Sequence, residues 1–137
     1  MKEIDRLIPH RHPFLYIDKL VSVSKDEIVG TMIFSDTDRF LRGSFPEFYF
    51  VPSAILMEAM AQCGGAGIKK LGLADGMFAF ANFDNANFYK GVEYEKVFTM
   101  VIKNIKIADK YLKQSGVGYI DNEPCLDLTW TCIRFQP

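Results

Sequence analysis

Residues 40–72 read FLRGSFPEFYFVPSAILMEAMAQCGGAGIKKLG, a loop rich in aromatic residues followed by a long apolar segment. Pro52 suits the first turn of a helix, where its missing N–H loses no hydrogen bond. Gly72 can adopt the left-handed conformation that ends a helix. We therefore predict a helix over roughly residues 52–71. Because apolar residues lie on almost every face of this segment, the helix should be buried on all sides.

One carboxylate, Glu58, lies in the middle of this apolar segment, and Gln62 follows one helical turn later. Burial of a carboxylate is costly unless the group is paired, neutralised or used in chemistry. From the periodicity alone, the simpler interpretation is a core glutamate satisfied by hydrogen bonds. The alternative is a carboxylate that belongs to a functional site, with Gln62 holding it in place.

Three glycines, Gly64, Gly65 and Gly67, fall in the second half of the predicted helix. Each glycine inside a helix costs about 1 kcal/mol of stability relative to alanine. We expect a strand or a partner to approach the helix backbone closely at these positions. A helix end that frays after Cys63 is the alternative.

The rest of the chain has the pattern of β-structure, with a short helix expected over residues 2–7. Alternating, β-branched and aromatic residues predict about six strands, over residues 16–24, 28–34, 76–89, 96–108, 110–120 and 125–135. A bulge or bend is expected at Asp84 and Asn85, and a turn at residues 121–123. These elements predict a single α+β domain over residues 1–137, in which an antiparallel sheet wraps around one long helix.

The composition narrows the range of functions. With 137 residues, 49% of them hydrophobic, and a net charge of −1, the chain suits one core and lacks the basic surface of a nucleic-acid-binding protein. Three cysteines without a CxxC pair argue against a disulfide framework or a zinc site, and we expect no metal and no cofactor. Charged residues interrupt the apolar segment too early for a membrane span, and the charged N-terminus lacks the apolar core of a signal peptide. We expect a cytoplasmic protein.

Three motifs in order along the chain carry a family resemblance: LIPHRHPFLYIDKL at residues 7–20, GSFP at 43–46 with LMEAMAQ at 56–62, and FANFDNANFYKG at 80–91. Together they resemble the bacterial 3-hydroxyacyl-acyl-carrier-protein dehydratases of the FabZ/FabA type. The resemblance covers nearly the whole chain. It implies a hotdog fold, an acyl thioester on acyl carrier protein as the substrate in fatty-acid or polyene-type synthesis, and a dimer whose sites straddle the subunit interface.

In this family a loop histidine acts on the C2 proton, and an acid on the central helix of the other subunit acts on the 3-hydroxyl. The resemblance places the acid at Glu58 and the histidine at Ser44, so the base is absent from this chain. A serine hydroxyl at neutral pH cannot replace an imidazole as a base. We therefore expect the chain alone to be a weak dehydratase or none.

The resemblance also implies substrate contacts. The backbone N–H of Ser53, at the start of the helix, would polarise the thioester carbonyl, a contact that does not depend on the side chain. Phe45, Gln62 and Asn82 would contact the substrate, and Asn82 replaces a glycine of the family pattern.

The two histidines have different expected roles. We expect His10 to be structural and to hold the proline-bounded loop, because the family also has a histidine there. His12 has two interpretations, a surface histidine or a substitute base.

Three functions remain open. The first is a subunit of a mixed dimer, in which this chain gives Glu58 to a site whose histidine comes from a related FabZ-like partner. The second is a homodimer that binds acyl thioesters without catalysis. The third is a homodimeric hydro-lyase or thioesterase with a rebuilt site that uses Glu58 and His12.

Overall fold

The computed structural model describes residues 1–37, 41, 47 and 49–135, and everything below concerns these residues. Ser44 and Phe45, two of the expected site residues, lie outside the described residues. The helices and strands are α1 (Glu3–Leu7), β1 (Lys19–Val23), β2 (Glu27–Ile33), α3 (Ser53–Lys70), β3 (Met77–Phe88), β4 (Val97–Ile107), β5 (Tyr111–Ile120) and β6 (Glu123–Phe135).

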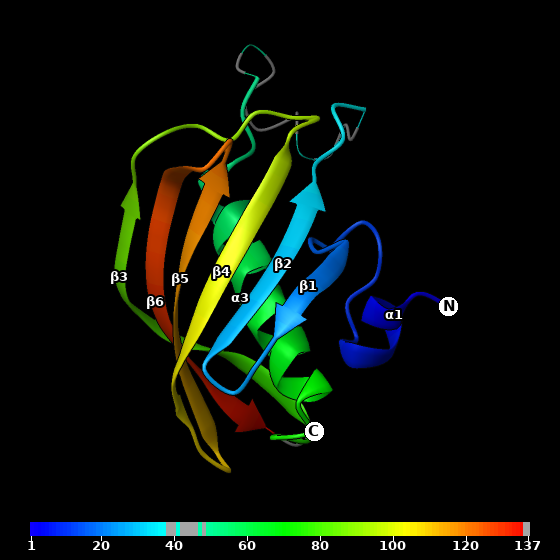
Figure 1. Ribbon diagram of the computed structural model, residues 1–137, viewed down its shortest axis with the longest axis vertical. Coiled ribbons are helices and arrows are strands. Elements are labelled where there is room, and N and C mark those ends of the chain that lie inside the picture. Colours follow the sequence, from blue (N-terminus) through cyan, green and yellow to red (C-terminus); the bar gives the residue numbers. More distant parts are fainter. Residues whose placement is uncertain (38–40, 42–46, 48, 136–137) are drawn as a thin grey trace.

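The six strands form one antiparallel sheet in the order β1-β2-β4-β5-β6-β3. The sheet curves around α3, which lies against one of its faces, while α1 lies beyond the β1 edge (Figure 1). This arrangement is the predicted hotdog fold, and the helix has nearly the predicted bounds. No helix within the described residues is both long enough and apolar enough to cross a membrane.

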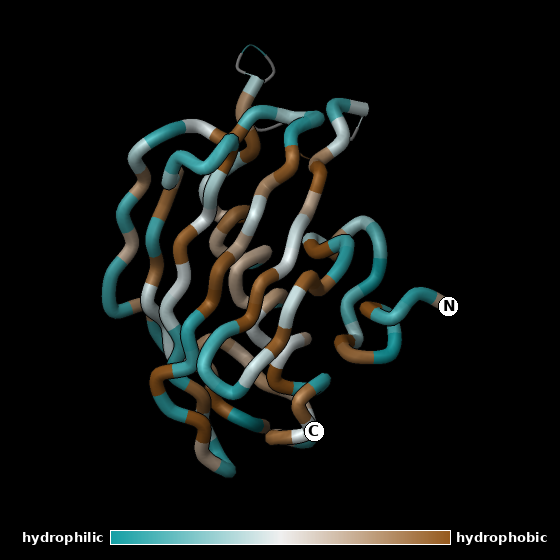
Figure 2. The backbone as a smooth tube through the Cα atoms, viewed as in Figure 1, coloured by the Kyte–Doolittle hydropathy of each residue, from teal (hydrophilic) through white to brown (hydrophobic). Residues whose placement is uncertain are grey.

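The core lies between the sheet and α3. Its largest fully buried side chains come from the sheet, the helix and the segment before β1, and include Trp130, Phe98, Met60 and Tyr16. Buried and half-buried residues alternate along the whole of β5. Figure 2 shows the same mixture of apolar and polar residues along the strands beside it. This period of two buries one face of the sheet against the helix and leaves the other face toward solvent.

Close approach of the sheet explains two of the three helix glycines. A Cβ on Gly64 would lie 2.3 Å from Gln114 Oε1, and a Cβ on Gly67 would lie 2.5 Å from two carbons of Ile28. No atom lies within 4 Å of the position that a Cβ on Gly65 would take. The helix continues to Lys70, and Gly72 ends it with φ +68°, so the expectation of close packing is confirmed and that of a frayed end is not.

Strand β3 is an edge strand that pairs only with β6 in the described sheet. Its register shifts twice, between Phe80 and Asn82 and between Phe83 and Asn85, and the second shift is the irregularity predicted from the sequence. One side of this twelve-residue strand therefore presents backbone groups without a neighbouring strand. Such an edge is a ready template for pairing with another chain.

Candidate functional site

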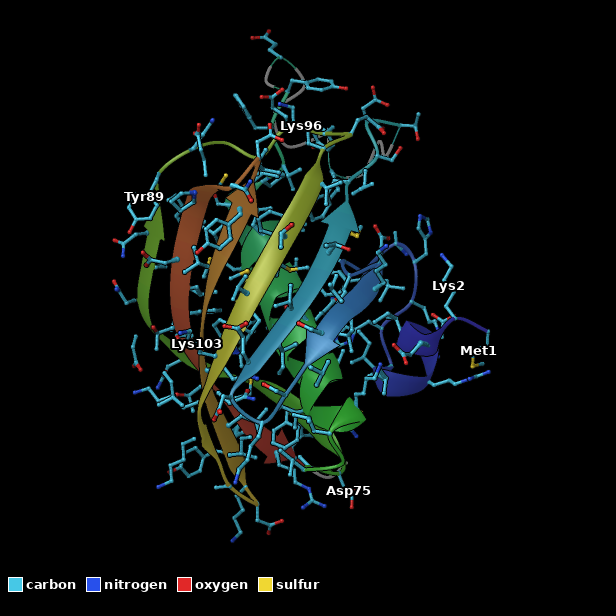
Figure 3. The ribbon with its side chains drawn as sticks, in the orientation of Figure 1. Met1, Lys2, Asp75, Tyr89, Lys96 and Lys103 are labelled. Atoms are coloured by element: carbon cyan, nitrogen blue, oxygen red, sulfur yellow. The ribbon has the colours of Figure 1, made fainter. Side chains whose placement is uncertain are left out.

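The Glu58 side chain lines a cavity of about 390 Å³ between the N-terminal segment, α3 and the end of the sheet that carries β3. The walls are mostly apolar, and they include Ile8, Ala61, Ile68, Phe78, Phe80, Leu112 and Phe135. Gly76 and Met77 also line the cavity, so it extends toward the end of the molecule where Asp75 lies in Figure 3. The side chain of Glu58 is 20% exposed, so its carboxyl group is partly shielded but accessible.

Gln62 holds the Glu58 carboxyl from the same helix. Gln62 is 2% exposed, and its Nε2 donates a hydrogen bond to Glu58 Oε1 at 3.1 Å. The same Nε2 donates to the backbone carbonyl of Phe14 at 3.1 Å, and Gln62 Oε1 accepts from the backbone N–H of Tyr16 at 2.7 Å. These bonds fix the orientation of the amide and tie α3 to the segment before β1.

His10 also contacts this carboxyl, which the sequence did not predict. Its Nε2 lies 3.6 Å from Glu58 Oε1, and its ring stacks on Phe14 with 6.3 Å between the ring centroids. Burial lowers the pKa of His10 below its usual value, Glu58 opposes this shift, and Arg11 adds to it. The net shift favours the neutral imidazole at neutral pH. His10 and Glu58 are 48 residues apart in the sequence (58 − 10), so no local pattern indicates this pairing.

The proline-bounded loop is held by Arg11, whereas the prediction gave this role to His10. The Arg11 guanidinium donates to the backbone carbonyls of Ile8, His10 and Asp5 at 2.9, 2.7 and 2.7 Å. A guanidinium suits this task because its planar fork carries five donors. The imidazole of His10 is thus left to face Glu58.

His12 lies elsewhere. It lines a separate hollow with Tyr16, Met32 and Phe34, and it is not among the residues that line the Glu58 cavity. The structure therefore brings His10, and not His12, to the carboxylate.

Ser53 and Asn82, two of the expected substrate contacts, also lie away from the Glu58 cavity. Ser53 begins α3 and lines a third hollow with Phe50, Phe88 and Tyr89, at the end of β3 where Tyr89 is labelled in Figure 3. Asn82 is exposed on β3 and lines none of these three hollows. Within the described residues, only Glu58 and Gln62 of the expected site residues come together.

Cys132 on β6 also lines the Glu58 cavity, but its thiol is not a nucleophile at neutral pH. Burial, with a smaller contribution from the Glu58 charge, raises its pKa to about 11. Because the thiolate is the nucleophile, this cysteine is unreactive at neutral pH. In the described part of the chain, no group of three or more His, Cys, Asp or Glu residues could hold a metal ion.

Comparisons with known proteins identify the family of this chain. Residues 2–71, just over half of the chain, match the family described as ApeP-like, ApeP dehydratase. The chain is 35% identical over 125 residues to the 3-hydroxyacyl-[acyl-carrier-protein] dehydratase FabZ of Hydrogenobaculum sp., covering 88% of this chain and 84% of that relative. It is 32% identical over 126 residues to FabZ of Coxiella burnetii, with 88% and 89% covered.

Solved structures show the same fold at low sequence identity. The dehydratase heterocomplex ApeI:P from Xenorhabdus doucetiae matches with a TM-score of 0.83 and 15% identity over 99% of this chain and 93% of that chain. The PaaI protein of Escherichia coli matches with a TM-score of 0.66 and 10% identity over 85% and 82%. These are hotdog proteins with a sheet wrapped around a helix. Within that class, the chain belongs to the ApeP-like, FabZ-type dehydratase family.

Proposed function

We propose that this chain is a subunit of a mixed-dimer (3R)-hydroxyacyl-acyl-carrier-protein dehydratase, to which it gives Glu58. The observation that carries the proposal is the Glu58 carboxyl in a largely apolar cavity, with Oε1 held by Gln62 and Oε2 without a partner among the described residues. Membership of a dehydratase family supports the reaction type. Assembly of the similarly folded ApeI:P as a heterocomplex supports the mixed dimer.

In the proposed reaction, the histidine of a related partner takes the C2 proton of the 3-hydroxyacyl thioester. The electrons of the broken C–H bond form the C2–C3 double bond, and the C3–O bond breaks. Glu58 gives a proton to the departing hydroxyl, which leaves as water. The acid and the base together return to their starting states when the histidine proton is released and the carboxyl group is reprotonated.

The edge of β3 that is unpaired in the described sheet is evidence for a partner chain that binds close to this cavity. Phe78 and Phe80 on β3 line the cavity, while Phe83 and Phe88 on the same strand are exposed. A chain that pairs with the open side of β3 would satisfy its backbone groups and cover these apolar side chains. It would also lie beside the cavity into which its histidine must reach.

A homodimeric enzyme would need its own base, and His10 is poorly placed for that role. Its Nε2 faces Glu58, and its Nδ1 is buried without a partner in the described part of the chain. Neither nitrogen is free to take a C2 proton. We therefore propose that the chain alone is weak, since loss of a general base removes roughly 10²–10⁴-fold in rate.

The test compares dehydration of a 3-hydroxyacyl-carrier-protein by three samples. They are the chain alone, its complex with a related dehydratase chain that keeps the loop histidine, and the same complex carrying Glu58→Gln. We expect weak, strong and weak activity, respectively. Glu27→Gln, the same change at an exposed position on β2, is the matched control. An active complex that is indifferent to Glu58→Gln would overturn the proposal.

Ser44→His in the chain alone is a second test. It should restore an acid and a base across a homodimer, because the change needs only a side chain that points into the same site. Binding of the acyl carrier protein without turnover by any sample would instead support the non-catalytic acyl-binding protein.

A further inference from the structure

Two side-chain nitrogens approach the same oxygen of Glu58, one from the same helix and one from the N-terminal segment. Gln62 Nε2 lies 3.1 Å from Oε1, and His10 Nε2 lies 3.6 Å from the same atom. Oε2 has neither contact. The carboxyl group is therefore held on one side only, and both Glu58 and His10 line the same cavity.

We propose that His10 is a positioning residue for Glu58, which together with Gln62 holds Oε1 so that Oε2 is presented to the cavity. This inference rests on the proposed function, because it gives His10 a role in the chemistry of Glu58. It assigns to His10 no proton transfer with the substrate.

The surroundings of the His10 ring favour the neutral imidazole with its proton on Nε2, the form that can direct an N–H toward Glu58. Nδ1 is buried and has no hydrogen-bond partner within the described residues, so an N–H there would be left unsatisfied. A neutral imidazole with its proton on Nε2 avoids this and directs its N–H toward Glu58 Oε1. Burial and Arg11 both act against the charged form, in the same direction.

The donor is also held rigidly with respect to the carboxylate. His10 stacks on Phe14, and the backbone carbonyl of Phe14 accepts a hydrogen bond from Gln62 Nε2, the atom that also bonds Glu58. These contacts, with that between His10 and Glu58, form a closed ring of four residues. Arg11 fixes the loop on the other side of His10 by its bonds to backbone carbonyls. Such a supporting shell is what keeps a reacting group within a fraction of an ångström of its productive position.

The pairing can be tested by nuclear magnetic resonance without any assay of activity. The chain has two histidines, so ¹⁵N spectra of their rings can be assigned with His12→Gln. We expect His10 to be the Nε2–H tautomer and to titrate below 6.5. Because the Glu58 charge raises the pKa of His10, Glu58→Gln should lower it further.

The charged or titratable groups near the pair are Arg11 on the loop, Lys69 on α3 and Cys132 on β6. The Glu58→Gln substitution replaces none of these three residues. A His10 titration and tautomer that do not respond to Glu58→Gln would therefore overturn the pairing.

The role in catalysis is tested in the mixed complex with two matched variants. His10→Gln keeps an N–H donor near the position of Nε2, whereas His10→Met fills similar space without a donor. We expect His10→Met to lower kcat on the order of ten- to hundredfold, the scale of a misplaced catalytic group, with KM little changed. His10→Gln should retain most of kcat, and thermal unfolding of both variants measures any purely structural loss.

The two proposals fail in different ways. A complex that needs Glu58 but is indifferent to His10→Met overturns the role of His10 alone. A complex that is active with Glu58→Gln overturns the proposed function, and His10 then has no catalytic carboxyl group to position. Equal losses of kcat in His10→Gln and His10→Met, in step with equal losses of stability, would show a structural role only.

Discussion

The fit between α3 and the sheet makes Gly67→Ala a sharp test of the packing. The new Cβ would lie 2.5 Å from Ile28 Cδ1 and Cγ1 and 2.6 Å from its Cγ2, where carbon atoms normally keep about 3.5–4.0 Å apart. Ile28 is 0% exposed and pairs with Ile102 on β4, so it has no open space to move into. Three such contacts predict the upper end of the overpacking range, about 3 kcal/mol.

Alanine also gains about 1 kcal/mol over glycine in helix propensity, which leaves a net loss of about 2 kcal/mol for Gly67→Ala. Gly65→Ala is the matched control two residues away, because no atom lies within 4 Å of its Cβ position. It should gain about 1 kcal/mol. Urea unfolding followed by circular dichroism, at one fixed protomer concentration, measures both changes.

A compensating substitution separates this clash from other causes. Ile28→Ala removes all three of the clashing atoms and should itself cost about 2–5 kcal/mol. The double variant with Gly67→Ala should lose less than the sum of the two, since residues in contact are not additive. Additive losses, or a Gly67→Ala chain as stable as the unaltered one, would refute the reasoning.

Three further predictions concern the site and the thiols. Folding lowers the pKa of His10 below 6.5, so below this pH the unfolded chain binds more protons at His10 than the folded chain does. The free energy of unfolding should therefore fall as the pH drops below 6.5. His10→Gln should reduce this fall, as measured by urea midpoints at a series of pH values. Gln62→Leu should destabilise the chain by roughly 1–3 kcal/mol for each buried group left unpaired, the N–H of Tyr16 among them, and an unchanged midpoint would contradict this. Burial raises the pKa of Cys63 to about 12, so at about pH 8 it should react with a thiol reagent only after denaturation; fast reaction of the folded chain would show that this thiol is exposed.

Local signals were enough to predict the elements of this fold. Pro52 and Gly72 bracket α3, which runs from Ser53 to Lys70, and each predicted strand is found with bounds within three residues. The largest difference is at β1, predicted from Tyr16 but observed from Lys19. There the backbone N–H of Tyr16 bonds the Gln62 side chain instead of a neighbouring strand. A contact across 46 residues cannot be read from the local pattern.

The start of β6 shows a second limit. The prediction placed a three-residue turn before it and began the strand at Cys125, but β6 starts at Glu123. Asp121 and Asn122 both have positive φ, of 50° and 65°, so they form a two-residue hairpin loop. Such loops match the twist of the flanking strands and let pairing begin at once.

Only part of the site was predictable, because one of its contacts lies within a single helix and the other joins segments far apart in the sequence. Glu58 and Gln62 lie on one helix at a spacing of four, so their contact follows from helix geometry. His10 reaches the carboxylate only through the path of the folded chain. Arg11 and Gln62 hold the segment around His10 by bonds to backbone groups, and the imidazole of this segment lies beside Glu58.

Helix α3 thus packs against the core on one side and lines the cavity on another. Its glycines lie on both sides. Gly64 and Gly67 let Gln114 and Ile28 of the sheet approach the helix backbone, closer than any side chain would allow. Gly65 lines the cavity and has no atom near its Cβ position, so there the absence of a side chain leaves space instead of closing it. Each of these glycines lowers helix stability by about 1 kcal/mol, yet the result is a helix packed tightly enough to hold Glu58 still beside an open cavity.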